Sequence, residues 1–185
     1  MWKRSTHSSG MKNTAITYWL IPSEPTRSFF ENKIADLARR YDAPVFEPHM
    51  TIHLGLDRSD VAEEVITKAA ICCGPIQARA LAIHHSSEFT KTLFVQFALN
   101  QKLSCLNEII RNGARDSSDY QLKPHLSLLY KTMSILARRQ LAHSIKLPFS
   151  RVVFDSIKAV RCVSPTRSRA DVEGWRVVAA KPLGR

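Results

Sequence analysis

The sequence contains one short motif twice, and this repetition constrains the fold more than any other feature. Residues 48–52 are Pro-His-Met-Thr-Ile and residues 124–128 are Pro-His-Leu-Ser-Leu. In an extended strand, side chains two residues apart lie on the same face, roughly 6.5–7 Å from each other. Each copy therefore predicts a histidine and a hydroxyl side by side on one face of a strand, with apolar neighbours on the opposite face, toward a core.

The bare pattern of a histidine followed two positions later by Ser or Thr is common in this chain, since it occurs at five of the seven histidines. Only His49 and His125 also follow a proline and have apolar residues on both sides of the hydroxyl. That hydroxyl belongs to Thr51 in the first copy and to Ser127 in the second. These four residues are therefore the candidates for a paired site.

The flanking sequence repeats with the same offset. When the chain is shifted so that His49 falls on His125, residues 16–21 align with residues 92–97 without a gap. Apolar positions at helical spacing align in the same way: Phe30, Ile34 and Ala38 with Leu106, Ile110 and Ala114, and Val65 and Ala69 with Leu141 and Ile145. Leu37 falls on Gly113, which is a mismatch. The pattern predicts a duplicated strand–helix–strand–helix unit.

The alternation of strand-like and helix-like segments predicts an α+β fold. We expect strands over residues 14–21, 45–56, 76–85, 90–99, 122–130, 147–162 and 175–180. We expect helices that end near residues 40, 71, 112 and 145, with capping residues within 23–27, at Asp60 and at Ser134. An Arg-rich polar loop is expected over residues 164–173, a disordered tail over residues 1–12, and a single bilobal domain over residues 13–185.

Charge and cysteine content limit the partners and the compartment. With 27 Lys and Arg against 16 Asp and Glu, the net charge of +11 favours a polyanionic partner such as RNA, although a basic soluble protein without such a partner has the same composition. The four cysteines, at positions 72, 73, 105 and 162, include no C-x-x-C spacing, so reduced thiols are expected. No apolar run has the length of a membrane span. We therefore expect a cytoplasmic monomer that does not bind membranes.

The two motifs resemble a known family. Residues 46–52 and 124–130 are similar to the signature pair of the two-histidine (2H) phosphoesterases. The second copy, Pro-His-Leu-Ser-Leu-Leu-Tyr, most resembles cyclic phosphodiesterases that open ADP-ribose 1″,2″-cyclic phosphate and nucleoside 2′,3′-cyclic phosphates. His53, where the family usually has an apolar residue, and the Lys131-Thr132 pair, where plant members tend to have Gly-Asp, depart from the pattern.

The resemblance implies two antiparallel-sheet lobes with outer helices and a central cleft lined by both motifs. It implies that His49 and His125 are catalytic and that Thr51, Ser127 and Tyr130 bind substrate. It implies no cofactor. The expected partners are a small cyclic nucleotide, ADP-ribose cyclic phosphate or RNA 3′ ends.

The chemistry of the residues agrees with that implication. Imidazole has an ordinary pKa of about 6.5, so one histidine can activate water while another protonates the departing ribose oxygen. We expect His125 to be the base and His49 the acid, with the Thr51 and Ser127 hydroxyls donating to the phosphate. Tyr130 could hold the phosphate or the water. Two imidazoles suffice without a metal, and the alternative, a zinc site from His49 and His53, has no carboxylate or cysteine at a matching spacing.

Several other residues could have a role in the site but are more simply explained as core or surface residues. His53, His84 and His85 are expected to be structural or on the surface. Aromatic residues in strands are usually core, although they could stack a base, and lysines beside a motif are usually solvated, although they could attract phosphate. These residues are Tyr18, Trp19, Phe89, Phe94, Trp175, Lys123 and Lys131.

The resemblance, together with the paired motifs, thus implies metal-independent hydrolysis of 2′,3′-cyclic phosphates to 2′-phosphates. The alternative is a module that binds RNA ends or nucleotides in the same cleft without turnover. The presence of both histidines and both hydroxyls favours the enzyme.

Overall fold

The computed structural model describes residues 13–184, and the tail expected over residues 1–12 lies outside this range. Seven strands, five α-helices and one 3-10 turn (Phe89–Lys91) follow in chain order within the described range. The strands are β1 (Asn13–Pro22), β2 (Met50–Leu56), β3 (Ile76–His85), β4 (Leu93–Phe97), β5 (His125–Leu129), β6 (Arg151–Ser164) and β7 (Arg176–Pro182). The helices are α1 (Thr26–Tyr41), α2 (Ala62–Cys72), α3 (Gln101–Gly113), α4 (Ile135–Ser144) and α5 (Arg169–Glu173).

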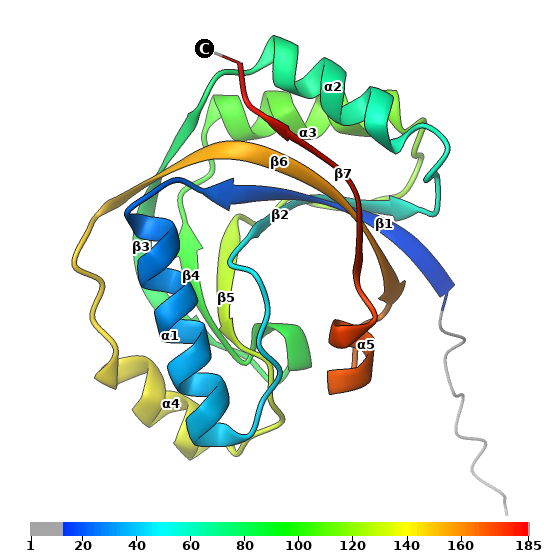
Figure 1. Cartoon of the computed structure of the whole chain (residues 1–185). Helices are drawn as coiled ribbons and strands as arrows, with labels where there is room; N and C mark the ends of the chain where they lie inside the picture. The colour runs from blue at the N-terminus through cyan, green and yellow to red at the C-terminus, as the bar shows by residue number, and fades with distance from the viewer. Residues whose placement is uncertain (1–12, 185) are drawn as a thin grey trace, which may run out of the picture.

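The described strands form one antiparallel sheet in the order β1-β2-β5-β4-β3-β6-β7 (Figure 1). The sheet closes on itself because β1 also pairs with β6. We call β1, β2, β6 and β7 the first half-sheet, and β3, β4 and β5 the second. The strands β2 and β5 join the halves through a single residue pair, Met50 with Leu126, and each member of that pair directly follows a motif histidine. The α+β class is confirmed, and the two expected lobes are halves of one sheet.

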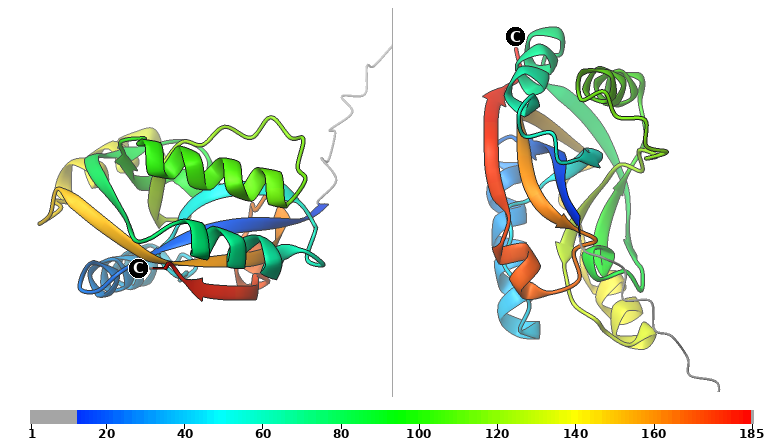
Figure 2. Two further views of the ribbon diagram at one scale, coloured as in Figure 1. Left: turned by 90° about the horizontal axis from the view of Figure 1, so that it is seen from above. Right: turned by 90° about the vertical axis from the view of Figure 1, so that its right-hand side faces the viewer.

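The duplication extends one element further than the sequence predicted. With the offset that places His49 on His125, β1, α1, β2 and α2 correspond to β4, α3, β5 and α4, and β3 also falls on β6. The first helix of each unit packs across the seam, since α1 packs against β5 and α3 against β2. In α3, the Asn107 side chain donates a hydrogen bond of 2.8 Å to the Ile52 carbonyl. Helices α2 and α3 lie side by side at one end of the molecule (Figure 2).

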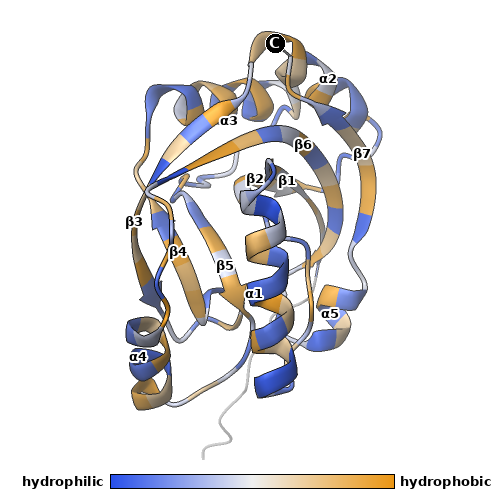
Figure 3. Cartoon of the chain, turned by 60° about the vertical axis from the view of Figure 1, so that its left-hand side comes forward, coloured by the Kyte–Doolittle hydropathy of each residue, from blue (hydrophilic) through white to orange (hydrophobic). Residues whose placement is uncertain are grey.

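The helices are two-faced, with apolar residues toward the sheet and polar residues outside (Figure 3). The apolar positions predicted from the repeat are buried, except that Ile145 is only partly buried and packs at the edge of the core. No helix within residues 13–184 is long and apolar enough to cross a membrane.

Both motif strands begin later than predicted, and each begins after its motif proline. Residues 43–49 are irregular, so β2 begins at Met50 rather than at residue 45, and β5 begins at His125 rather than at residue 122. Proline has no backbone N–H for a strand ladder, which explains why neither strand includes it. His49 therefore lies just before its strand, whereas His125 is the first residue of its own.

Helix ends were predicted with mixed success. The Ser134 hydroxyl caps α4 by accepting from the Ala137 backbone N–H at 3.3 Å, as expected. Neither α1 nor α2 has a side-chain cap; the Asp60 carboxylate pairs with Arg58 instead. The polar loop over residues 164–173 contains α5, which the sequence analysis missed because the helix has only five residues and lies within an Arg-rich polar segment.

Gly113 provides a test of the packing between α2 and α3. A Cβ atom at Gly113 would lie 3.2 Å from Val65 Cγ2, so the glycine allows α3 to approach α2 closely. We expect Gly113→Leu, which copies Leu37 of the first repeat, to lower the free energy of unfolding by about 1–3 kcal/mol through overpacking. Chemical denaturation measures the change. Adding Val65→Ala should restore most of the loss, and equal losses in both backgrounds would contradict the packing explanation.

Candidate active site

One cavity gathers the five residues that the sequence singled out. It has a volume of about 290 Å³, and its walls include His49, Thr51, His125, Ser127 and Tyr130. The two motifs enter it from opposite sides of the seam between β2 and β5. The fold thus brings together side chains from two segments that are distant in the sequence.

Both histidines are held by the same local contact. His49 Nδ1 lies 2.6 Å from the carbonyl oxygen of Glu47, and His125 Nδ1 lies 2.7 Å from that of Lys123. A carbonyl only accepts, so each Nδ1 carries the proton and donates it. Each Nε2 is thereby the basic nitrogen, and it forms no hydrogen bond within the described part of the chain. A ligand in the cavity can therefore meet two Nε2 atoms of defined protonation.

His49 is enclosed by aromatic rings. Its imidazole stacks on Trp19 with 3.8 Å between ring centroids and 13° between planes, and the edges of Phe46 and Trp175 close two more sides. The pKa of His49 is lowered to about 4, mainly by burial; the charges of His125 and Lys158 contribute to the lowering, and the hydrogen bond to the Glu47 carbonyl opposes it. The neutral form of His49 therefore dominates near pH 7 in the unliganded protein.

His125 is less enclosed. Its ring meets the edge of Phe94 at 5.5 Å and is half-buried. Burial lowers its pKa, the Lys123 carbonyl raises it, and the smaller effects of Lys91 and Glu88 oppose each other. The two imidazoles are thus held alike but differ in how far the protein disfavours their charge.

The three hydroxyls differ in their partners. Ser127 Oγ donates to the Thr90 carbonyl at 2.7 Å, so it must rotate before it can donate to a ligand. Thr51 Oγ1 forms no hydrogen bond within residues 13–184 and is available at the cavity wall. Tyr130 is buried against Phe46, with 3.8 Å between stacked rings, and burial raises the pKa of its hydroxyl while its hydrogen bond with Ser127 opposes the rise.

His53 points away from the cavity because of a bulge in β2. Thr51 pairs with Trp19 while His53 pairs with Tyr18, so Ile52 is the extra residue. Cross-strand partners share a face, and adjacent residues of β1 face opposite ways; Trp19 lines the cavity and Tyr18 is in the core. His53 is fully buried, and its Nε2 lies 2.7 Å from Asp116 Oδ2. A structural role for His53 is therefore confirmed.

This bulge argues against a zinc site formed by His49 and His53. His49 and His53 face different sides of the half-sheet, and no group of three or more potential metal ligands occurs within residues 13–184. His84 is exposed and His85 is partly exposed, both outside the cavity wall, as expected.

Only some of the remaining candidates line the cavity. Trp19, Trp175 and Lys123 line the cavity, whereas Tyr18, Phe89 and Phe94 do not, and the Lys131 ammonium donates to the Asp42 carbonyl. Sequence reasoning missed other residues of the wall: Thr17, Leu54, Glu88, Thr90, Lys91 and the segments 120–121 and 162–166. Only their long-range pairing places them there, and the one local signal was the cationic Lys91 near the hairpin turn.

Comparison with known proteins agrees with this geometry. The model of the cyclic phosphodiesterase-like protein family matches residues 14–183. The chain belongs to this family. It is a 2H phosphoesterase, and the family assigns it to the hydrolases of phosphodiester bonds. No curated protein matches the chain by sequence.

Solved structures with a similar fold are distant in sequence. Unliganded LigT from E. coli is 11% identical, with a TM-score of 0.56 over 95% of this chain and 100% of LigT. TT0787 of Thermus thermophilus is 16% identical, with a TM-score of 0.57 over 94% of this chain and 98% of that one. At these identities the likeness shows that this 2H phosphoesterase shares their fold.

The titration of His49 tests the aromatic enclosure. Its imidazole should titrate with a midpoint near 4 in the unliganded protein. Because this folded-state pKa lies below the unfolded value of about 6.5, the neutral ring stabilises the fold at neutral pH, and that contribution is lost as pH falls toward 4. NMR of the ring resonances measures the midpoint. Trp19→Leu should move it toward 6.5, and a wild-type midpoint at or above 6.5 would refute the enclosure.

Proposed function

We propose that this 2H phosphoesterase hydrolyses 2′,3′-cyclic phosphates to 2′-phosphates without a metal. The substrate class comprises nucleoside 2′,3′-cyclic phosphates, ADP-ribose 1″,2″-cyclic phosphate and RNA ends that carry such a phosphate. One observation supports the proposal above the others: two imidazoles with identical Nδ1 anchoring line a single cavity and leave both Nε2 atoms unbonded within the described residues.

The reaction needs only a proton acceptor and a proton donor across one phosphate. One neutral imidazole takes a proton from water as the water oxygen attacks phosphorus. The bond from phosphorus to O3′ breaks, and the other, protonated imidazole gives its proton to O3′. Thr51 Oγ1, and Ser127 Oγ after rotation away from Thr90, donate to the non-bridging oxygens, where negative charge grows. The net change is the addition of one water to one ester bond.

The acid and base roles depend on which imidazole charges more easily. The sequence analysis gave the base role to His125. The stronger enclosure of His49, whose pKa is near 4, favours the opposite order in the unliganded protein, because a base must be neutral and an acid protonated. We therefore propose His49 as the base and His125 as the acid. Single-residue variants distinguish the two orders, because loss of the acid removes the alkaline limb of the pH–rate profile.

The cavity size bears on the substrate. At about 290 Å³ it lies at the small end of ligand sites, which span about 300–1,000 Å³. It suits a cyclic phosphate and its ribose, and the rest of a longer substrate would extend to the surface, where a charge of +11 favours a polyanion. Crystal structures of LigT contain 3′-AMP, phosphate, ATP and NADP⁺, so a related fold accommodates nucleotides and phosphate.

The alternative function is a module that binds nucleotides or RNA ends without turnover. It needs the cavity and its cations but not two anchored imidazoles. Incubation with 2′,3′-cyclic AMP separates the two functions, since a binding module would protect the cyclic phosphate rather than open it.

Removing either histidine should be costly for catalysis. We expect His49→Ala and His125→Ala each to lower kcat/KM for 2′,3′-cyclic AMP by at least about a hundredfold, the usual scale for a general acid or base. Thr51→Ala and Ser127→Ala should lose about ten- to a thousandfold. His84→Ala is the matched control, because His84 lies outside the cavity wall. Near wild-type rates in either histidine variant would refute the assignment of the two histidines.

The same assay should be run with the wild-type protein in EDTA, where the rate should persist because both proton transfers use imidazoles. Loss of the rate in EDTA, restored by Zn²⁺, would instead show a metal-dependent reaction.

The position of the product phosphate tests how the ribose is held. The resemblance to cyclic phosphodiesterases implies a 2′-monophosphate, and one fixed ribose orientation places the acid next to O3′ alone. ³¹P NMR of the product should therefore show a single 2′ isomer. The pH–rate profile should be bell-shaped, since one imidazole must be neutral and the other protonated. A 3′-monophosphate or a mixture would contradict this orientation.

A further inference from the structure

The anchoring of His49 depends on a segment that has no regular secondary structure. Residues 43–49 connect α1 to β2 without ladder hydrogen bonds of their own. The carbonyl that accepts from His49 Nδ1 belongs to Glu47, within this segment. Whatever fixes Glu47 therefore also fixes the imidazole.

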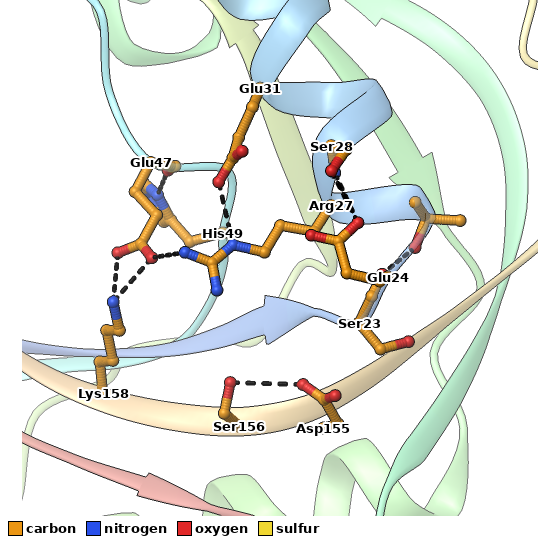
Figure 4. Close-up of polar contacts among 11 residues, drawn as sticks. Ser23, Glu24, Arg27, Ser28, Glu31, Glu47, His49, Asp155, Ser156 and Lys158 are labelled. Carbon is orange, nitrogen blue, oxygen red and sulfur yellow. Dashed lines mark hydrogen bonds and ion pairs between the residues drawn. The ribbon is translucent and has the colours of Figure 1, made fainter.

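The Glu47 side chain is held by two cations from different elements (Figure 4). Lys158 Nζ, on β6, lies 2.6 Å and 2.7 Å from the two carboxylate oxygens, and Arg27 Nη2, on α1, lies 3.1 Å from one of them. Arg27 is itself oriented by Glu31, at 2.9 Å. The Lys158 and Glu47 side chains are only 21% and 22% exposed, so solvent screens this pair less than a typical surface pair.

Lys158 also lies beside the residue on which His49 stacks. In the ladder between β1 and β6, Lys158 is the register partner of Trp19. The Trp19 ring stacks on His49 at 3.8 Å. The ion pair thus fastens the irregular segment to the strands that form the other support of the imidazole.

The second motif has no equivalent ion pair within residues 13–184 and does not need one. Lys123 occupies the position that corresponds to Glu47 and offers its carbonyl to His125 in the same way, but its side chain lines the cavity. His125 is already in the sheet, where it pairs with Gln96 of β4. Backbone pairing positions one histidine, whereas side-chain ion pairs position the other.

We propose that Glu47 and Lys158, assisted by Arg27, are positioning residues that hold His49 in its reactive orientation through the Glu47 carbonyl. This inference rests on the proposed function, in which His49 transfers a proton. None of the three residues lines the cavity itself. Removal of this network should therefore affect the chemical step rather than substrate binding.

The charges around His49 give the network a second effect. The charges of Lys158 and His125 act on its imidazole, and Glu47 and Arg27 are the other charged members of the network. Burial is the main cause of the low pKa of His49, and the Lys158 charge lowers it further. Loss of the lysine charge should therefore raise the midpoint of His49, a change that a purely structural ion pair elsewhere would not cause.

The test compares Lys158→Met, Glu47→Gln and Lys158→Arg with wild type, using 2′,3′-cyclic AMP. We expect the first two to lower kcat by about ten- to a hundredfold, the scale of a small misplacement of a catalytic group, with KM within about threefold. Lys158→Arg, which keeps the charge and can still reach the carboxylate, should retain kcat within about threefold. Unchanged kcat in folded Lys158→Met and Glu47→Gln would overturn the proposal.

A matched control is available in the same region of the sheet. Lys181 of β7 pairs with Glu63 of α2 at 3.3 Å, far more exposed than the Glu47 pair. Lys181→Met should leave kcat and the His49 titration unchanged. An equal fall of kcat in Lys181→Met would attribute the effect to general destabilisation and overturn the proposal.

NMR titration of the His49 ring separates this inference from the proposed function. It requires no turnover, so it reports on positioning even if 2′,3′-cyclic AMP is not hydrolysed, a result that would count against the function alone. The midpoint should rise in Lys158→Met, and the resonances of His49 should shift in both uncharged variants while those of His125 stay in place. Wild-type titration and resonances of His49 in these variants would overturn the proposal by this second measure.

Discussion

The short hydrogen bond from each histidine Nδ1 to the carbonyl two residues earlier is the interaction on which the site depends. At 2.6 Å and 2.7 Å, these bonds fix the tautomer and the ring orientation together, because a carbonyl can only accept. The intervening proline, Pro48 or Pro124, fixes its own φ and disfavours the helical conformation of the residue before it, which carries the accepting carbonyl. Without this contact, either ring nitrogen could carry the proton, and neither Nε2 would be a defined base.

The sheet turns these two local contacts into one site. Its halves join between the motif strands at the single pair of Met50 and Leu126, so the histidines that precede this pair come from opposite sides of one seam. Helix α1 of the first repeat packs on β5 of the second, and helix α3 of the second repeat packs on β2 of the first. These contacts couple the two repeats. Folding thus orders the proposed acid and base before a substrate binds.

The repeat allowed much of this to be predicted. The constant offset between the two copies gave the element order, the buried helix positions and the four motif side chains, because hydrophobic periodicity and the His-x-hydroxyl spacing are local signals. The bulge at Ile52 was not predictable in this way, and it explains why His53 leaves the face of Thr51. The pairing of Glu47 with Lys158 joins positions 111 residues apart, so neither hydrophobic periodicity nor motif spacing could predict it.

The two copies of the motif have diverged in how they hold the same ring. One imidazole lies in an irregular segment under a tryptophan and beside an ion pair, and the other begins a strand and is less buried. Because the two imidazoles lie in different environments, the protein lowers their pKa values to different extents. Acid and base roles for one residue type require such a separation.

The kinetics of the double variant His49→Ala/His125→Ala test most directly whether both imidazoles act on one phosphate. Groups that work as a unit in one transition state show strongly non-additive losses. The account predicts that kcat/KM of the double variant with 2′,3′-cyclic AMP lies within about tenfold of the weaker single variant. A loss equal to the product of the two single losses would show that the histidines act independently, and it would contradict a shared site.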